Sequence, residues 1–260
     1  MVKSVAMNST TRDSDPSVAG GAPNLPPVDA TAARRPGEVL APELLASLLA
    51  DGDDELAVWA LSQALSEASR ASVYDGLLAD AMRLVGERWA SGRWTVAEEH
   101  LASQTLLRAL DRLRPASGPE SRIGPLAVLA GAQGEHHMIG LVCLDHVLRE
   151  GGWTVANLGG DVPIADLSRF IERNDVGLLA LSASDLARSS AILETIARAR
   201  AAAGSRRGSN APPLPVLLGG RLAEHPGVGA RVGATWSGRS LAEAQAIARS
   251  LLGSIPAAVG

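Results

Sequence analysis

The sequence predicts a helical bundle followed by a doubly wound α/β domain with five parallel strands. Up to residue 114, leucines and alanines recur at spacings of three and four, the period of amphipathic helices. From residue 125 onward, short apolar runs alternate with helical stretches, and parallel strands need such crossover helices. The chain has 260 residues, 46% of them hydrophobic, so it can bury the core of one or two compact domains.

The charge and the cysteine content exclude several classes of protein. A formal net charge of -4 and a pI near 5.8 leave no basic footprint for nucleic acid, so we expect no direct DNA binding. The single cysteine, Cys143, excludes an intramolecular disulfide framework. No window approaches the roughly 18 apolar residues of a membrane span, and the N-terminus lacks the apolar region of a secretory signal. We therefore expect a cytoplasmic protein without a membrane partner.

Three segments precede the second domain. Residues 1–37 are rich in Ser, Thr, Pro, Gly and Ala and have no period, which predicts a disordered leader. Residues 38–114 are predicted to form a bundle of about four or five helices, with runs such as LAVWALSQAL and VYDGLLADAMRLVGERW. Residues 115–124 are rich in Pro, Gly and Ser and are predicted to be an interdomain linker.

The second domain, residues 125–260, contains five predicted strands. They are the apolar runs PLAVLAGA, WTVANLGG, VGLLALSAS, PLPVLLGG and ATWSG. Helices are expected at 138–150, 164–173, 190–203 and 241–252, and a shorter one between the last two strands. Strands connected in this way become buried on both faces of a parallel sheet.

Polar and small residues follow the predicted strands, at the edge where ligands bind to open parallel sheets. In strand order they are the loop GEHHMIG at 134–140, Asp161 and Val162, Ser182 and Ser184, Gly219 and Gly220, and Ser237 and Gly238. The sequence therefore predicts a binding site at the carboxyl edge of the sheet.

The first loop argues against a dinucleotide and suggests a metal. It lacks the pattern G-x-G-x-x-G and places Glu135 and His137 where a pyrophosphate needs bare backbone amides. A metal-ligating histidine commonly donates its second ring N–H to a carboxylate, although a solvated loop histidine is the ordinary alternative. This half of the sequence has no further His, Cys or carboxylate cluster to complete a zinc site. A metal would therefore have to arrive with its own ligands, as in a macrocycle.

The loop and the following strands resemble a known family. Glu135, His137 and Gly140, then S-x-S and GG, are similar to the D-x-H-x-x-G, S-x-L/T and GG signature of cobalamin-binding domains in the base-off, His-on mode. The resemblance implies a Rossmann-like domain in which His137 is the lower axial ligand of cobalt, with His136, Met138 and Ile139 beside it. It also implies that Gly140 lets the corrin approach, and that small residues at 182, 184, 219 and 220 leave room for the displaced nucleotide tail.

The bundle carries a second resemblance. Trp89, nine residues, and then Glu99 and His100 are similar to the W-x9-EH motif of the light-sensing cobalamin domains of CarH-type regulators. The resemblance implies that the bundle caps the upper face of the corrin, with Trp89, Val96, Glu99 and His100 around an adenosyl group. An indole offers an apolar lid, and a carboxylate can accept hydrogen bonds from ribose hydroxyls. Packing inside the bundle is the ordinary alternative for Trp89 and the expectation for Trp59 and Trp94.

Two departures from the CarH-type pattern affect the expected mechanism. Those regulators carry a MerR-like DNA-binding domain ahead of the bundle, whereas the leader here is too short and unpatterned for a helix-turn-helix. We therefore expect the signal to leave through a downstream protein partner or a change between oligomers such as a dimer and a tetramer. Ala90 stands where some members carry a histidine that binds cobalt after photolysis, so His100 is the nearest substitute on the upper side.

Several functions remain open. The leading hypothesis is a non-enzymatic photoreceptor that binds adenosylcobalamin, with a bilin such as biliverdin at His136 as a further variant. The alternatives are a corrinoid carrier protein of a methyltransferase system, which has the same layout, and a cobalamin store. A mutase is disfavoured because the chain contains no substrate barrel.

Overall fold

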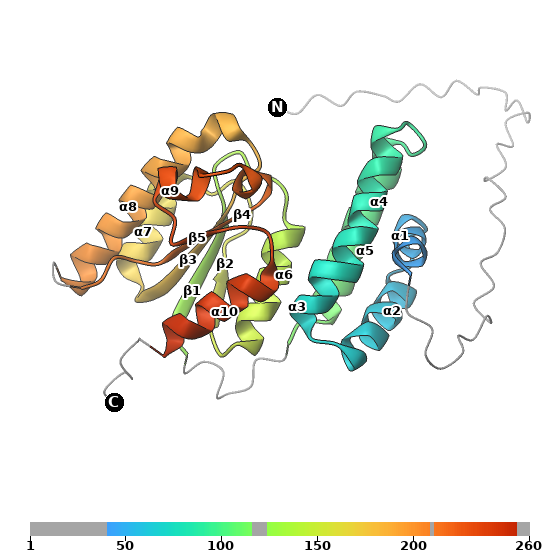
Figure 1. The fold of residues 1–260 in the computed structure, drawn as a ribbon, viewed down its shortest axis with the longest axis horizontal. Coiled ribbons are helices and arrows are strands. Elements are labelled where there is room, and N and C mark those ends of the chain that lie inside the picture. Colours follow the sequence, from blue (N-terminus) through green and yellow to red (C-terminus); the bar gives the residue numbers. More distant parts are fainter. Residues whose placement is uncertain (1–40, 116–123, 209–210, 254–260) are drawn as a thin grey trace, which may run out of the picture. The chain divides into compact units, whose positions relative to one another are not determined.

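The computed structural model describes residues 41–115, 124–208 and 211–253. The predicted leader and most of the predicted linker lie outside these ranges. The predicted fold class is confirmed, since a helical region precedes a five-stranded parallel sheet with flanking helices (Figure 1). None of the described helices combines the length and the apolar character that crossing a membrane requires.

The helical region consists of five α-helices and one π-helical turn. The helices are α1 (Pro42–Ala50), α2 (Asp54–Glu67), α3 (Arg70–Val73), α4 (Ala79–Ala90) and α5 (Val96–Arg112). The π-helical turn η1 (Tyr74–Leu78) interrupts what the sequence pattern predicts as one helix. Such turns are rare and are frequently found at functional sites.

The hairpin between α4 and α5 is determined by local chemistry. Gly92 adopts a positive φ of 72°, which glycine reaches without strain, and α4 ends just before it. Thr95 and Glu98 form a reciprocal capping box that starts α5. The hairpin therefore brings Trp89 at the end of α4 and Glu99 at the start of α5 to the same end of the bundle.

The sheet has the order β2-β1-β3-β4-β5, and every pair is parallel. Its strands are β1 (Leu126–Gly131), β2 (Thr154–Asn157), β3 (Val176–Ser182), β4 (Val216–Gly219) and β5 (Trp236–Ser237). The chain leaves β1 toward β2 on one side and then returns to β3 on the other. The carboxyl ends of β1 and β3 consequently flank the topological switch point, where open α/β sheets bind ligands.

Helices cover both faces of the sheet (Figure 1). On one face, α7 (Ile164–Arg173) and α8 (Ser189–Arg207) pack on Val128, Ala130 and alternating residues of the neighbouring strands. On the other face, α6 (Ile139–Glu150) and α10 (Leu241–Leu252) pack on Ala127 and Leu129. The short helix α9 (Val228–Val232) lies between β4 and β5. Helix α8 extends beyond the predicted 190–203.

Helix α6 also packs against the bundle. Cys143 and Val147 are buried in the apolar core of the helical region, while Leu141 and Leu148 are buried against the sheet. A helix that is apolar on more than one side is buried on more than one side. Helix α6 therefore joins the two parts of the chain and carries, at its start, the loop with His137.

Candidate functional site

The loop that follows β1 is held in place by backbone hydrogen bonds from two neighbouring strands. Ala132 donates to the Ser182 carbonyl at 2.9 Å, and Val162 donates to the Gly131 carbonyl at 3.0 Å. A Cβ atom at Gly160 would lie only 2.6 Å from the Glu135 carbonyl oxygen, so glycine is required for this close approach. The carboxyl ends of β1, β2 and β3 are thus brought together, as the sequence predicts.

Asp161 fixes the tip of this loop. It is the one non-glycine residue in the described ranges with a positive φ, 51°, a conformation that aspartate tolerates better than most side chains. Its Oδ1 accepts a hydrogen bond from the Gly134 backbone at 2.6 Å. Val162 next to it pairs with Ala132 through the backbone. Both residues therefore shape the loop that carries His137.

Glu135 and His137 form a close pair. Glu135 Oε1 lies 2.5 Å from His137 Nδ1 and accepts from the His137 backbone at 2.9 Å. The Glu135 side chain is 6% exposed, whereas the imidazole is 78% exposed. Burial by itself would raise the pKa of Glu135, but hydrogen bonds from the His137 backbone, the Ser184 side chain and the imidazole lower it below its usual value.

This geometry determines which ring nitrogen is free. A carboxylate only accepts hydrogen bonds, so the proton of the neutral imidazole lies on Nδ1 and the lone pair of Nε2 remains available. The arrangement matches a metal-ligating histidine oriented by a carboxylate. His137 thus fits the role of an axial cobalt ligand. His136 is also exposed, and no described group of three His, Cys, Asp or Glu side chains could hold a metal ion.

The glycines near this loop fall into two groups. A Cβ at Gly140 would meet no atom within 4 Å, and one at Gly219 would meet only backbone oxygens at 3.9 Å. Gly220, in contrast, has a φ of 82° and would collide with the Ala183 carbonyl at 2.4 Å. The fold therefore requires glycine at Gly220 but not at Gly140 or Gly219, where the missing side chain leaves space for a ligand.

The remaining residues predicted at this edge pack within the fold. A Cβ at Gly229 would lie 2.1 Å from Ser237 Oγ, and one at Gly238 would lie 2.6 Å from the Trp236 ring. Ile139 packs against the core of the bundle. Ser182 is half-buried at the end of β3, and Met138 is half-buried over Gly159 and Gly160.

The predicted upper group lies at the hairpin end of the bundle. Trp89 is 49% exposed and Val96 is 54% exposed, so neither belongs to the bundle core. Glu99 Oε2 lies 2.6 Å from His100 Nδ1, and Glu99 Oε1 accepts from Ser103 at 2.9 Å. The imidazole is 72% exposed. Exposed apolar surface at the same end of the bundle as a positioned carboxylate suits a ligand with apolar and hydroxyl groups.

Two other tryptophans of the bundle differ in their exposure to solvent. Trp94 is half-buried, and the Arg88 guanidinium lies 4.8 Å from the centre of its ring. Trp59 is 48% exposed, so the expectation that it packs in the core is wrong. Within the described chain, no hydrogen bond or ion pair connects the Trp89, Glu99 and His100 group to the His137 loop.

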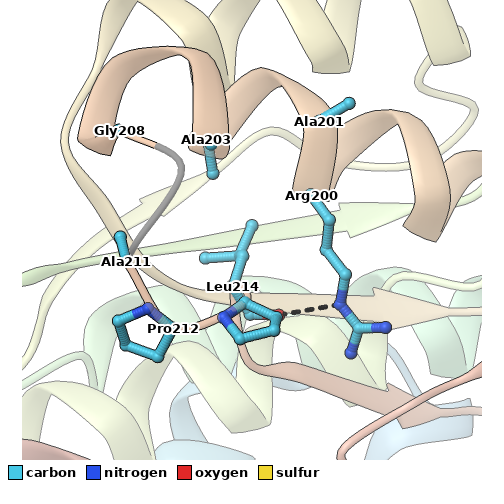
Figure 2. A pocket seen from close by; sticks show the side chains of 9 residues that line it. Arg200, Ala201, Ala203, Gly208, Ala211, Pro212 and Leu214 are labelled. Atoms are coloured by element: carbon cyan, nitrogen blue, oxygen red, sulfur yellow. Dashed lines mark hydrogen bonds between the residues drawn. The ribbon is translucent and has the colours of Figure 1, made fainter.

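Two of the pockets lined by described residues lie at opposite edges of the sheet. One, of about 500 Å³, lies between the end of α8 and the segment that precedes β4, where Arg200 donates to the Leu214 carbonyl at 3.2 Å (Figure 2). It is at the amino end of β4, opposite the predicted site. The other, of about 440 Å³, lies between α5, α6 and the end of β2, and Met138 is part of its lining.

Sequence reasoning missed the polar contacts between the bundle and the α/β domain. Arg70 pairs with Glu150 at 2.7 Å, and Tyr74 Oη lies 2.9 Å from His146 Nδ1. Asp75 accepts from Ser240 and from the backbone of Leu241 and Ala242, at the start of α10. These partners lie 70 residues or more apart in the chain, and no local pattern indicates such pairs.

Comparison with known proteins identifies both parts of the chain. Residues 43–114 and residues 125–229 match two family models, each described as a B12 binding domain. The HTH-type transcriptional repressor CarA of Myxococcus xanthus is 34% identical over 149 residues, which are 56% of this chain and 46% of CarA. The repressor CarH of the same organism is 35% identical over 164 residues, which are 63% of this chain and 52% of CarH. The chain thus spans about half the length of these relatives.

The fold also has a solved counterpart. The monomethylamine corrinoid protein of Methanosarcina barkeri superposes with a TM-score of 0.63 and 19% sequence identity, over 80% of this chain and 96% of that one. At this identity the likeness concerns the fold.

Proposed function

The chain belongs to the B12-binding domain family, whose models match residues 43–114 and 125–229. From this membership we propose that the protein is a light sensor that uses adenosylcobalamin. Adenosylcobalamin, when bound, would supply a cobalt–carbon bond that green or blue light breaks. The likeness to CarA and CarH supports a regulatory role over an enzymatic one. The output would be a changed surface on the bundle that a partner protein or a second copy of the chain recognises.

The observation that carries the proposal is the Glu135–His137 pair. The buried carboxylate holds Nδ1 and the backbone of an otherwise exposed histidine. Nε2 is thereby oriented at the switch point of the sheet before any ligand arrives, which reduces the entropy lost on binding. Gly140 and Gly219 leave the adjacent surface open.

The hairpin end of the bundle would hold the upper ligand. Trp89 and Val96 offer apolar surface for an adenine ring, and Glu99 offers a carboxylate for ribose hydroxyls. His100 would be the histidine on the upper side able to hold cobalt, because the contact of its Nδ1 with Glu99 leaves Nε2 available. Loss of the nucleoside would expose Trp89 and Val96 again, which alters the surface presented to a partner.

A corrinoid carrier of a methyltransferase system is the second candidate. Its support is the fold shared with the monomethylamine corrinoid protein, over nearly the whole of that chain. A carrier has to present the upper face of the corrin to another enzyme, and an apolar lid with a carboxylate would obstruct that access. The exposed Trp89, with Glu99 at the same end of the bundle, therefore favours the light sensor. A bilin at the exposed His136 is a further variant, which reconstitution with biliverdin alone would test.

Spectroscopy of the reconstituted full chain tests the light-sensor proposal. Adenosylcobalamin is added in the dark, and absorption and size-exclusion elution are measured before and after green light. A base-off, His-on dark spectrum that converts under light, together with a changed elution volume, supports the proposal. Photoconversion no faster than that of free adenosylcobalamin, with unchanged elution, contradicts it. Retention of a methyl group from methylcobalamin and its transfer to a thiol would then indicate the carrier.

A further inference from the structure

The pocket between α5, α6 and the end of β2 begins next to the histidine loop. Met138 follows His137 in the chain and lies over Gly159 on the opposite wall. Helices α5 and α6 each line the pocket with residues spaced three or four positions apart, which lie on one face of a helix. The lining residues are Leu107, Asp111, Arg114, Met138, Val142, Asp145, His146, Asn157, Leu158 and Gly159.

A chain of hydrogen bonds from the bundle favours one tautomer of His146. Arg70 Nη1 donates to Tyr74 Oη at 2.9 Å, and Tyr74 Oη lies 2.9 Å from His146 Nδ1. A guanidinium can only donate, so the hydroxyl accepts from Arg70, and the buried hydroxyl hydrogen is satisfied when it is donated to His146 Nδ1. Nε2 then carries the hydrogen. Among the described residues no group accepts from Nε2, although His146 is only 1% exposed and lines the pocket.

The Asp145 carboxylate, which precedes His146 in the chain, offers the pocket a hydrogen-bond acceptor. Asp145 is 5% exposed and follows the same face of α6 into the pocket lining. Its Oδ1 accepts from Arg149 at 2.7 Å, and Arg114 lies 3.5 Å from Oδ2. Each carboxylate oxygen has two lone pairs, so both retain capacity for another donor. The pocket therefore presents one N–H donor and one carboxylate acceptor on adjacent residues.

We propose that this pocket binds a primary carboxamide, namely one propionamide at the rim of the corrin ring. Its oxygen accepts from His146 Nε2, and its NH₂ group donates to Asp145. The inference rests on the cobalamin binding of the proposed function and adds a contact that selects the side chains of the ring. Met138 lines the pocket and directly follows His137 in the chain, so the pocket adjoins the loop that would hold the ring.

Other side chains fit the pocket less well. A carboxylate could accept from His146 but could not donate to Asp145, which leaves two acceptors facing each other. An ammonium group could donate to Asp145 but would face the hydrogen of His146 Nε2. Leaving one buried polar group unsatisfied costs about 1–3 kcal/mol, equivalent to roughly five- to 150-fold in affinity.

Singly hydrolysed cobalamins provide the test. Binding of aquacobalamin to the full chain at pH 7 in the dark is compared with binding of the isomers in which one propionamide is a carboxylate. We expect one isomer to bind about tenfold or more weakly than aquacobalamin, and the other isomers to bind nearly as well. Equal affinities for all isomers would overturn the proposal, and this measurement needs no variant.

Asp145→Asn separates the pocket from general electrostatics. An asparagine can donate to a carboxylate, so this variant is expected to bind the disfavoured isomer several-fold more tightly than the wild type does. Asp166→Asn removes the same charge from an exposed position on α7 and should leave the isomer preference unchanged. Equal effects of both variants would also overturn the proposal. A failure of the proposed function is distinct, because aquacobalamin itself would then give no His-on spectrum.

Discussion

Glu135 Oε1 lies within hydrogen-bonding distance of both His137 Nδ1, at 2.5 Å, and the His137 backbone nitrogen, at 2.9 Å. A single carboxylate oxygen thus fixes the ring and the main chain of the same residue. Because Glu135 is buried and its own backbone accepts from Asp161, the orientation of the imidazole is transmitted from the strands beneath it.

His137→Ala should abolish the His-on form of bound cobalamin. The variant removes the one loop imidazole whose Nδ1 is held by a carboxylate, so the absorption spectrum at neutral pH should change to that of cobalamin without a protein ligand. His136→Ala is the matched control, since it removes a neighbouring exposed histidine for which no hydrogen bond to Glu135 is present. An unchanged spectrum in His137→Ala, or the same change in both variants, would contradict the assignment.

Trp89→Ala should reduce the preference for adenosylcobalamin over methylcobalamin. Removing the indole deletes apolar surface that only the larger upper ligand can use, and a loss of about 1–2 kcal/mol corresponds to roughly five- to 30-fold in relative affinity. Trp59→Ala is the control, because Trp59 on α2 has nearly the same exposed fraction, 48% against 49%. The two dissociation constants are measured for each variant in the dark. Equal preferences in both variants would speak against an upper site at Trp89.

Asp75→Ala should loosen the start of α10. Its carboxylate accepts from the backbone of Leu241 and Ala242, so hydrogen exchange at these two amides should accelerate and stability should fall by about 1 kcal/mol. Asp53→Ala removes a comparable cap at α2, within the bundle, and should leave exchange in α10 unchanged. Protection of Leu241 and Ala242 equal to that of the wild type would show that Ser240 alone caps the helix.

His146 should make stability depend on pH in the weakly acidic range. Burial lowers the pKa of His146 to about 4, from 6.5 in an unfolded chain, and the nearby arginines add to the shift. Between these values the unfolded chain binds more protons, so the free energy of unfolding is constant above pH 6.5 and falls as pH decreases toward 4, by on the order of 3 kcal/mol. Urea titrations at pH 7, 6 and 5 measure this slope. His146→Phe should flatten the dependence of the free energy of unfolding on pH. An identical slope in the variant would show that His146 does not cause it.

The arrangement of strands and helices could be predicted because the sequence patterns are local. Continuous apolar runs in β1 and β3, buried almost throughout, with helices between them, leave few topologies for a parallel sheet. Helices α7 and α10 begin and end at the predicted residues, since a proline and a serine mark their starts. The π-helical turn at Tyr74 could not be predicted, because no local pattern separates its residues from the helical run around them.

The candidate site was predictable where its residues share one loop and not where they come from distant segments. Glu135 and His137 are two positions apart, so their pairing is visible in the sequence. The contact of His146 with Tyr74 depends on how α6 packs against η1, and the sequence indicates only that both residues can be buried. The exposure of Trp59 likewise depends on which face of α2 meets the core.

The polar contacts of the bundle with the α/β domain come from one end of it. Arg70, Tyr74 and Asp75 lie within two turns, and Arg114 at the end of α5 adjoins them, because Arg70 also donates to the Leu113 carbonyl. Trp89 lies fourteen positions beyond Asp75, roughly 21 Å along a helix. If α4 tilts as a rigid helix about η1, residues far from η1 move most. A tilt of about 10° would carry Trp89 through roughly 4 Å and move the contacts near η1 by only a fraction of that. A small rearrangement near η1 and a large displacement of Trp89 at the hairpin end would thus be the same motion.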